Sequence, residues 1–125
     1  MTNESTLSVE EFEDHRVSAR LNEIHAMEDS NDPGVLSRLA NAMFDPNLEV
    51  KLAALQTLSD KEGKKVTYFI RQGLTDADAE FRMEVLEALA DRGDIESIRH
   101  AKFDPDEAIR ERAADIVVDA EQQRH

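Results

Sequence analysis

Several residue types are absent or scarce in this 125-residue sequence, and each absence excludes a class of structure. Cysteine is absent, which excludes a disulfide framework, a thiolate metal site and a cysteine nucleophile. Tryptophan is absent, the other aromatic residues are five phenylalanines and one tyrosine, and there are four glycines and three prolines. Because strands favour aromatic residues and need frequent turn residues, this composition argues against a β-sheet and favours an all-α fold.

Basic residues and long apolar runs are also in short supply. The 15 lysines and arginines face 28 aspartates and glutamates, so the formal net charge is −13. A negative field repels phosphate backbones and anionic lipid surfaces and attracts basic proteins, so we expect no binding to nucleic acid or membranes. Acidity also promotes solubility by itself. No apolar run approaches the ~20 residues that cross a bilayer, and the polar N-terminal segment lacks a basic start, so we expect a cytoplasmic protein.

One pattern occurs three times, beginning at Asp45, Asp76 and Asp104. In each copy a large apolar residue follows at offset 5, a basic residue at offset 6, and further apolar residues at offsets 9, 10 and 13, which together form one stripe of an α-helix. Proline follows Asp45 and Asp104, so the pattern predicts that these aspartates cap the helices. The copies start 31 and 28 residues apart, a period typical of a stacked helical solenoid.

The repeated residues resemble the second helix of a HEAT repeat, and the short period is most similar to the HEAT-like repeats of phycobilin lyases. The resemblance covers roughly residue 35 to the C-terminus, although the first helices lack proline and the third of them is short. It implies helical hairpins in which aspartates and basic residues of neighbouring repeats form a hydrogen-bonded ladder. In this chain the ladder would contain Asp45, Lys51, Asp76, Arg82, Asp104 and Arg110.

Helix-start and helix-stop signals organise the chain into a cap and three repeats. We expect a disordered tail at residues 1–7 and one domain at residues 8–125, with a capping helix within 8–29 and repeats at 33–60, 61–92 and 94–122. The capping helix begins at the capping box Ser8-Val9-Glu10-Glu11, and its stripe is irregular between Phe12 and Val17. Terminal units of solenoids are often atypical; the alternative is that this helix binds a partner. The predicted fold is an all-α solenoid of three HEAT-like hairpins with an N-terminal capping helix.

A candidate interaction surface lies opposite the apolar stripe, at offsets 4, 8, 11 and 15. All four positions are acidic in the second copy, and the border position at offset 7 is apolar in two copies. Apolar residues beside an acidic row suit a basic or amphipathic partner, while the alternative is a solvated helix face. The resemblance implies that second helices line a concave, partner-binding face. The candidate partner-binding residues are Glu49, Leu52, Gln56, Glu80, Met83, Glu84, Glu87 and Asp91.

Motifs for catalysis, metal binding and cofactor binding are missing from the sequence. The four histidines lack the spacing of a helical zinc site, and the Asp76-x-Asp78-x-Glu80 segment lacks the glycine of a calcium loop. No glycine-rich phosphate loop or nucleophile elbow occurs. We therefore expect no metal, no cofactor and no enzymatic activity. The predicted function is a non-enzymatic protein–protein interaction adaptor. The alternatives are an accessory subunit of a chromophore- or cofactor-attaching lyase, implied by the resemblance, and an inhibitor of a basic enzyme.

Overall fold

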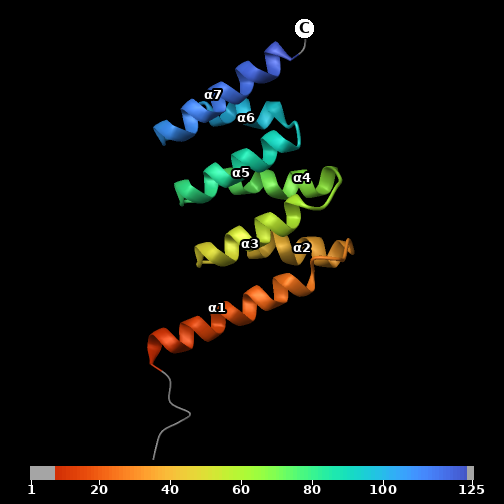
Figure 1. Cartoon of the computed structure of the whole chain (residues 1–125), viewed down its shortest axis with the longest axis vertical. Coiled ribbons are helices and arrows are strands. Elements are labelled where there is room, and N and C mark those ends of the chain that lie inside the picture. The colour runs from red at the N-terminus through yellow and green to blue at the C-terminus, as the bar shows by residue number, and fades with distance from the viewer. Residues whose placement is uncertain (1–7, 124–125) are drawn as a thin grey trace, which may run out of the picture.

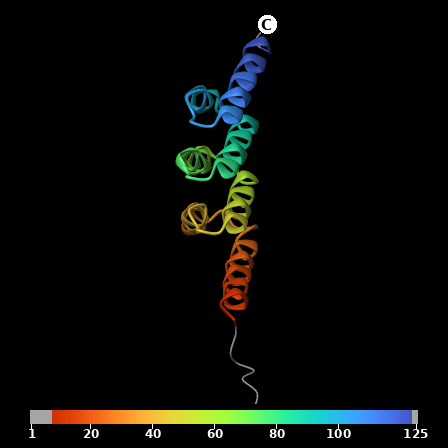
Figure 2. The ribbon, with the colours of Figure 1, turned by 90° about the vertical axis from the view of Figure 1, so that its left-hand side faces the viewer.

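The computed structural model describes residues 8–123, which form two layers of helices (Figures 1 and 2). The predicted tail at residues 1–7 lies outside the described residues. Every regular element within residues 8–123 is helical, which confirms the predicted all-α solenoid. The elements are α1 (Val9–Ala26), α2 (Pro33–Ala42), α3 (Leu48–Ser59), α4 (Lys64–Arg71), the short 3-10 helix η1 (Gln72–Thr75), α5 (Ala79–Asp91), α6 (Ile95–Ala101) and α7 (Glu107–Gln122).

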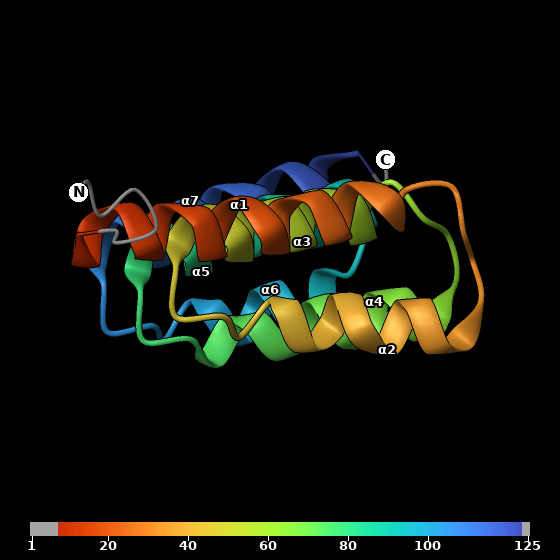
Figure 3. The same ribbon diagram turned by 90° about the horizontal axis from the view of Figure 1, so that it is seen from below.

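Three helical hairpins stack along the long axis of the molecule. They pair α2 with α3, α4 and η1 with α5, and α6 with α7. The first helices α2, α4 and α6 form one layer, and the second helices α3, α5 and α7 form the other (Figure 3). The N-terminal helix α1 lies in the layer of second helices and packs against α3. It therefore occupies the place of a second helix, with no first helix before it in the described part of the chain.

The core lies between the two layers and contains the repeated apolar stripe. At offset 5 the stripe supplies Val50, Phe81 and Ile109, all of which are buried. From the first layer, residues such as Leu39 and Ile70 are fully buried against it. Burying the stripe of each second helix under a first helix removes apolar area from water along the whole stack, which is what holds a solenoid together.

A close approach between layers depends on one glycine. Gly73 lies in η1, and a Cβ placed on it would be 2.6 Å from the Val85 Cγ2 atom and 2.9 Å from the Met43 Cε atom. A real methyl group does not fit at these distances. Glycine at position 73 therefore lets η1 lie directly against α5.

The second helices begin two residues later than predicted. Their caps are Asn47, Asp78 and Asp106, whose side-chain oxygens accept hydrogen bonds from backbone N–H groups in the first helical turn. The prediction that the repeated aspartates are the caps was wrong. Each of them instead accepts a hydrogen bond from the N–H of the residue two positions on, at 2.8–2.9 Å. The repeated aspartate and the residue two positions later are both chemically able to cap a helix. The carboxylate of the repeated aspartate takes part in the ion pairs described below.

The N-terminal helix begins as predicted but buries only part of its apolar side. The Ser8 hydroxyl caps α1 by accepting from the Glu11 N–H at 3.1 Å. Ile24 is buried in the core, whereas Val9 is 82% exposed and Phe12 is 53% exposed. These two lie in an extension of α1, because α1 begins eight residues earlier than α3 when the helices are aligned on their repeat positions. This extension reaches beyond the start of α3, the neighbouring helix in the same layer (Figure 1).

Candidate interaction face

Ion pairs join each repeat to the next where a first helix turns into a second helix. Lys51 Nζ donates to Asp76 Oδ1 at 2.7 Å. Arg82 makes a bidentate contact with Asp104, with Nε–Oδ2 and Nη2–Oδ1 distances of 2.9 and 3.0 Å. These pairs link α3 to the loop before α5, and α5 to the loop before α7. The basic residue of one repeat thus reaches the aspartate of the next.

A third pair extends this series to α1 and was not predicted from the sequence. Arg20 Nε donates to Asp45 Oδ2 at 2.7 Å, and Arg20 Nη2 donates to Asp45 Oδ1 at 3.2 Å. Arg20 precedes Lys51 by 31 residues, and Lys51 precedes Arg82 by the same number. That spacing was an available signal, and so was the sequence around it, since Asp14, Ile24 and Met27 stand at offsets 0, 10 and 13 of the pattern. Ala19 and Glu23 interrupt the pattern at offsets 5 and 9, where the other copies carry a large apolar residue and an apolar residue.

Arg110 occupies the ladder position of the last hairpin in a different way. Its Nη1 atom donates to the backbone oxygens of Asp104 and Pro105 at 2.8 and 3.0 Å. Arg82 makes the corresponding bond to the Asp76 backbone oxygen at 2.8 Å. Within residues 8–123, Arg110 pairs with no aspartate of a following repeat, so the prediction that places it in an inter-repeat pair is not met there.

The pair of Arg82 and Asp104 is strongly shielded from water. Both side chains are about nine-tenths buried. Burial alone would raise the pKa of Asp104, but hydrogen bonds from Arg82 and the Asp106 N–H, together with the charge of Arg82, outweigh it and lower that pKa. The hydrogen bond to Asp104 raises the pKa of Arg82. Both groups are therefore charged near neutral pH and act as structural links.

Two further basic side chains organise the opposite edge of the stack, and sequence reasoning missed both. Lys61 is buried, and its Nζ atom donates to the backbone oxygens of Met27 and Glu28 at 3.1 and 2.8 Å. Arg92 Nε donates to the Thr67 hydroxyl at 2.7 Å. Lys61 thereby ties the end of α1 to the loop after α3, because it satisfies carbonyl groups that a helix end leaves open.

Five of the eight candidate partner-binding residues line one groove between α3 and α5. The groove has a volume of about 320 Å³. Glu49, Glu80 and Met83 are not part of its lining. Glu84 and Asp91 are exposed on its rim, and Leu52 is half-buried at its floor. The lining residues are Leu52, Leu55, Gln56, Ser59, Glu84, Glu87, Ala88 and Asp91.

One residue of the predicted acidic row is not free. Glu87 accepts from Arg112 of α7, with Oε2–Nε and Oε1–Nη2 distances of 2.6 and 2.9 Å. These hydrogen bonds are the main cause that lowers the pKa of Glu87 and raises that of Arg112. The negative charge of the acidic row on α5 is therefore balanced by a basic side chain at this position. Arg112 lies 25 residues further along the chain, on another helix, where a pattern read within one helix does not find it.

The second-helix face is hollowed by grooves and not by a pronounced curvature. Figure 2 shows the column of second helices nearly straight, which differs from the concave face implied by the resemblance. A second groove, between α5 and α7, is lined by Asp91, Arg112, Ile116 and Asp119 among others. Asp91, the last residue of α5, lines both grooves.

Residues 8–123 contain no group of three or more His, Asp or Glu side chains that is placed to hold a metal ion. None of the helices that the structure describes has both the length and the apolar character required to span a membrane.

Comparison with known proteins identifies the repeats. A family model described as HEAT repeats matches residues 33–117, more than half of the chain. The match runs from the start of α2 into α7, so it includes the three hairpins and leaves out α1. It concerns HEAT repeats in general and does not bear on the resemblance to phycobilin lyases. No curated protein and no solved structure gave a match.

Proposed function

Because the chain belongs to the HEAT-repeat family, whose repeats generally mediate protein–protein interactions, we propose that it is a non-enzymatic adaptor. Its partner is a protein segment that is basic or amphipathic, and the segment docks on the face formed by α3, α5 and α7.

The groove between α3 and α5 is the single observation that carries the proposal. Leu52 and Leu55 give its floor an apolar character, and Glu84 and Asp91 give its rim negative charge. Neither of these two carboxylates has an ion-pair partner among residues 8–123. An apolar centre within a charged rim is the usual arrangement of a protein docking site, where the centre supplies affinity and the rim supplies selectivity.

The charge of the whole chain supports the same partner chemistry. A net charge of −13 speeds the encounter with a basic partner and slows it with an acidic one. Salt screens this steering beyond about 8 Å at physiological ionic strength. We therefore expect capture of the partner to weaken as salt is raised.

The test is a charge reversal that leaves the core and the ladder untouched. In the Glu84→Lys, Asp91→Lys double variant, two exposed carboxylates become basic without loss of a described ion pair. Glu87 is kept, because its reversal would also break the bond to Arg112. The matched control is Asp29→Lys, Glu96→Lys, which changes the net charge equally at exposed positions outside the groove lining.

Both variants and the unaltered protein are immobilised, and proteins captured from the source cell extract are quantified. We expect one or more basic proteins that bind the unaltered chain and the control but are lost from the reversal variant. Circular dichroism checks that all three remain equally helical. Equal capture by the reversal variant and the control would remove this face from the proposal.

A further inference from the structure

The helix α1 is a second helix whose first helix is missing from the described residues. Arg20 pairs with Asp45 as Arg82 pairs with Asp104, so α1 stands in the same register as the other second helices. It also packs against α3 within their layer. In the three hairpins, the corresponding place beside a second helix is filled by α2, α4 or α6 (Figure 3). Beside α1, no helix of residues 8–123 fills that place.

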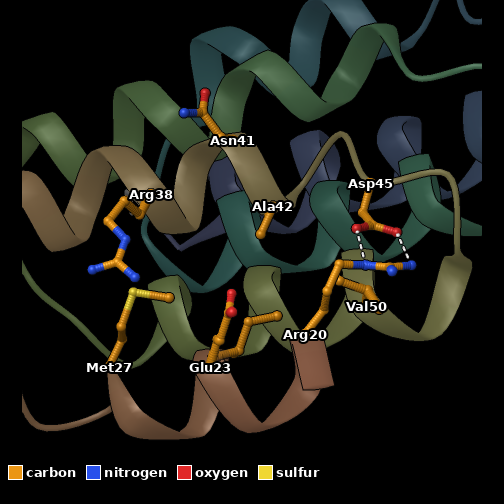
Figure 4. A pocket seen from close by; sticks show the side chains of 9 residues that line it. Arg20, Glu23, Met27, Arg38, Asn41, Ala42, Asp45 and Val50 are labelled. Carbon is orange, nitrogen blue, oxygen red and sulfur yellow. Dashed lines mark hydrogen bonds and ion pairs between the residues drawn. The ribbon is translucent and has the colours of Figure 1, made fainter. Parts of the chain in front are cut away.

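A groove between α1 and α2 marks the open place (Figure 4). Its volume is about 330 Å³. Glu23 and Met27 extend from α1 toward α2, and Arg38 extends from α2 toward α1. The groove lining consists of Arg20, Glu23, Ile24, Met27, Arg38, Asn41, Ala42, Asp45 and Val50.

Position 23 of α1 carries an exposed charged residue where the other second helices carry a buried apolar residue. Aligned on the ladder, Glu23 corresponds to Ala54, Val85 and Ala113. Those three are completely buried within their hairpins. Glu23 is exposed and carries a carboxylate that has no ion-pair partner among residues 8–123. A buried and unpaired carboxylate is costly, so a helix that covers this site has to leave Glu23 with a positive charge beside it. Arg38 lines the same groove but forms no ion pair with Glu23 among residues 8–123, which leaves the carboxylate available to a basic group of the covering helix.

The flank of α1 beside the groove also carries its exposed apolar residues. Val9, Phe12, Arg16, Arg20 and Glu23 follow one another at steps of three or four residues, which places them on one side of the helix. The separate stripe that faces the core consists of Val17, Leu21, Ile24 and Met27. The irregular step between Phe12 and Val17 is thus a change from one stripe to another. The stripe through Phe12 continues the groove along α1.

We propose that the groove between α1 and α2 binds a short amphipathic helix of a partner protein, which takes the place of the missing first helix. Its apolar side packs on Ala42 and on the Phe12 end of the stripe, and a lysine or arginine on that helix pairs with Glu23. A second copy of this chain is disfavoured as the occupant, because two chains of charge −13 repel each other. This docking site is separate from the face on α3, α5 and α7, and either can fail without the other.

The test uses two synthetic helical peptides of about 14 residues, similar in length to the longer helices of a hairpin. Each peptide has one side rich in leucine and alanine. At a position next to that side, midway along the helix, the first peptide carries a lysine and the second carries a glutamate. Anisotropy of a fluorescent label gives the dissociation constants. Backbone amide chemical shifts of the uniformly labelled protein locate the site.

We expect the lysine peptide to shift amides in residues 20–27 and 35–42 and to bind at least tenfold more tightly than the glutamate peptide. Glu23→Lys should invert that preference, because the charge at the centre of the site is reversed. Asn41→Trp, at an exposed position on the groove wall, should weaken both peptides at least tenfold by filling the groove. Asp29→Lys, Glu96→Lys, at exposed positions outside the lining of either groove, is the control and should leave both dissociation constants within twofold.

Three results would overturn the proposal. The first is the absence of shifts in the two ranges at millimolar peptide. The second is an unchanged preference in the Glu23→Lys variant. The third is that, without peptide, the amide shifts in these ranges change with protein concentration and sedimentation velocity shows a dimer. That result would assign the groove to a second copy of the chain. Circular dichroism of each variant checks its fold.

Discussion

Arg20 and Asp45 join α1 to the first hairpin with the same bidentate geometry that joins Arg82 to Asp104 at the other end of the stack. With Lys51 and Asp76 between them, these pairs make a continuous ladder of three rungs. The family match begins only at residue 33, so it omits the helix that supplies the first rung. The ladder therefore identifies α1 as part of the repeat structure where the family match does not.

Removal of the last rung should destabilise the stack as a whole. In Arg82→Ala, the Asp104 carboxylate keeps only the hydrogen bond from the Asp106 N–H, and the Asp76 backbone oxygen loses its bond from Arg82, in a site that is largely shielded from water. We expect a loss of about 1–3 kcal/mol in the free energy of unfolding, measured by urea denaturation. Arg110→Ala is the matched control, because Arg110 bonds only to backbone oxygens of its own loop among the described residues. A loss from Arg110→Ala as large as that from Arg82→Ala would contradict the structural role of the rung.

Removal of the first rung should act locally. Arg20→Ala cuts the bidentate contact with Asp45, but Lys61 still holds the end of α1 through backbone oxygens. We expect amide hydrogen exchange in α1 to become faster while exchange in α5 and α7 is unchanged, because units at the end of a stack open separately. Hydrogen-exchange mass spectrometry measures this difference. Uniform acceleration across all helices would mean that α1 unfolds together with the hairpins.

The Gly73 position should not accept even one methyl group. In Gly73→Ala the new Cβ would meet Val85 Cγ2 at 2.6 Å, so either η1 or α5 has to move. We expect a loss of about 1–3 kcal/mol in the free energy of unfolding from this overpacking. In the double variant with Val85→Ala, the contacted methyl group is absent. The combined loss should then be smaller than the sum of the two single losses, and strict additivity would exclude a direct clash.

The rung at Asp104 predicts a specific dependence of stability on pH. Its folded-state pKa is lowered, so its ion pair stabilises the fold above the ordinary aspartate value of 3.8 and loses this contribution as the pH falls through the lowered value. We compare the unaltered protein with Asp104→Asn by urea denaturation between pH 7 and pH 2.5. The difference in unfolding free energy should be constant near neutral pH and shrink only below about pH 4. A difference that is already lost at pH 6 would assign the effect to another group.

The positions of the helices and of their buried sides were determined by the sequence alone. Val50, Phe81 and Ile109 recur at one offset from an aspartate, and the burial of such a periodic stripe is the shared requirement of every stacked hairpin. The exact helix starts were harder to predict, since Asp76 and Asp78 are both chemically able to cap α5. Only the neighbouring repeat, which supplies Lys51, decides that Asp76 forms the ion pair and Asp78 the cap.

Tertiary structure alone decided which side chains of the candidate face are free and where the stack is open. Glu87 and Arg112 are 25 residues apart, and so are Arg20 and Asp45, so neither pair belongs to a single helix. The exposure of Glu23 on α1 is likewise not readable from the sequence of α1. It depends on whether a helix of the other layer packs over that residue. Helical periodicity is a local property and can be read from neighbouring residues. Pairing and coverage arise between elements that are distant in sequence, and only their packing brings them together.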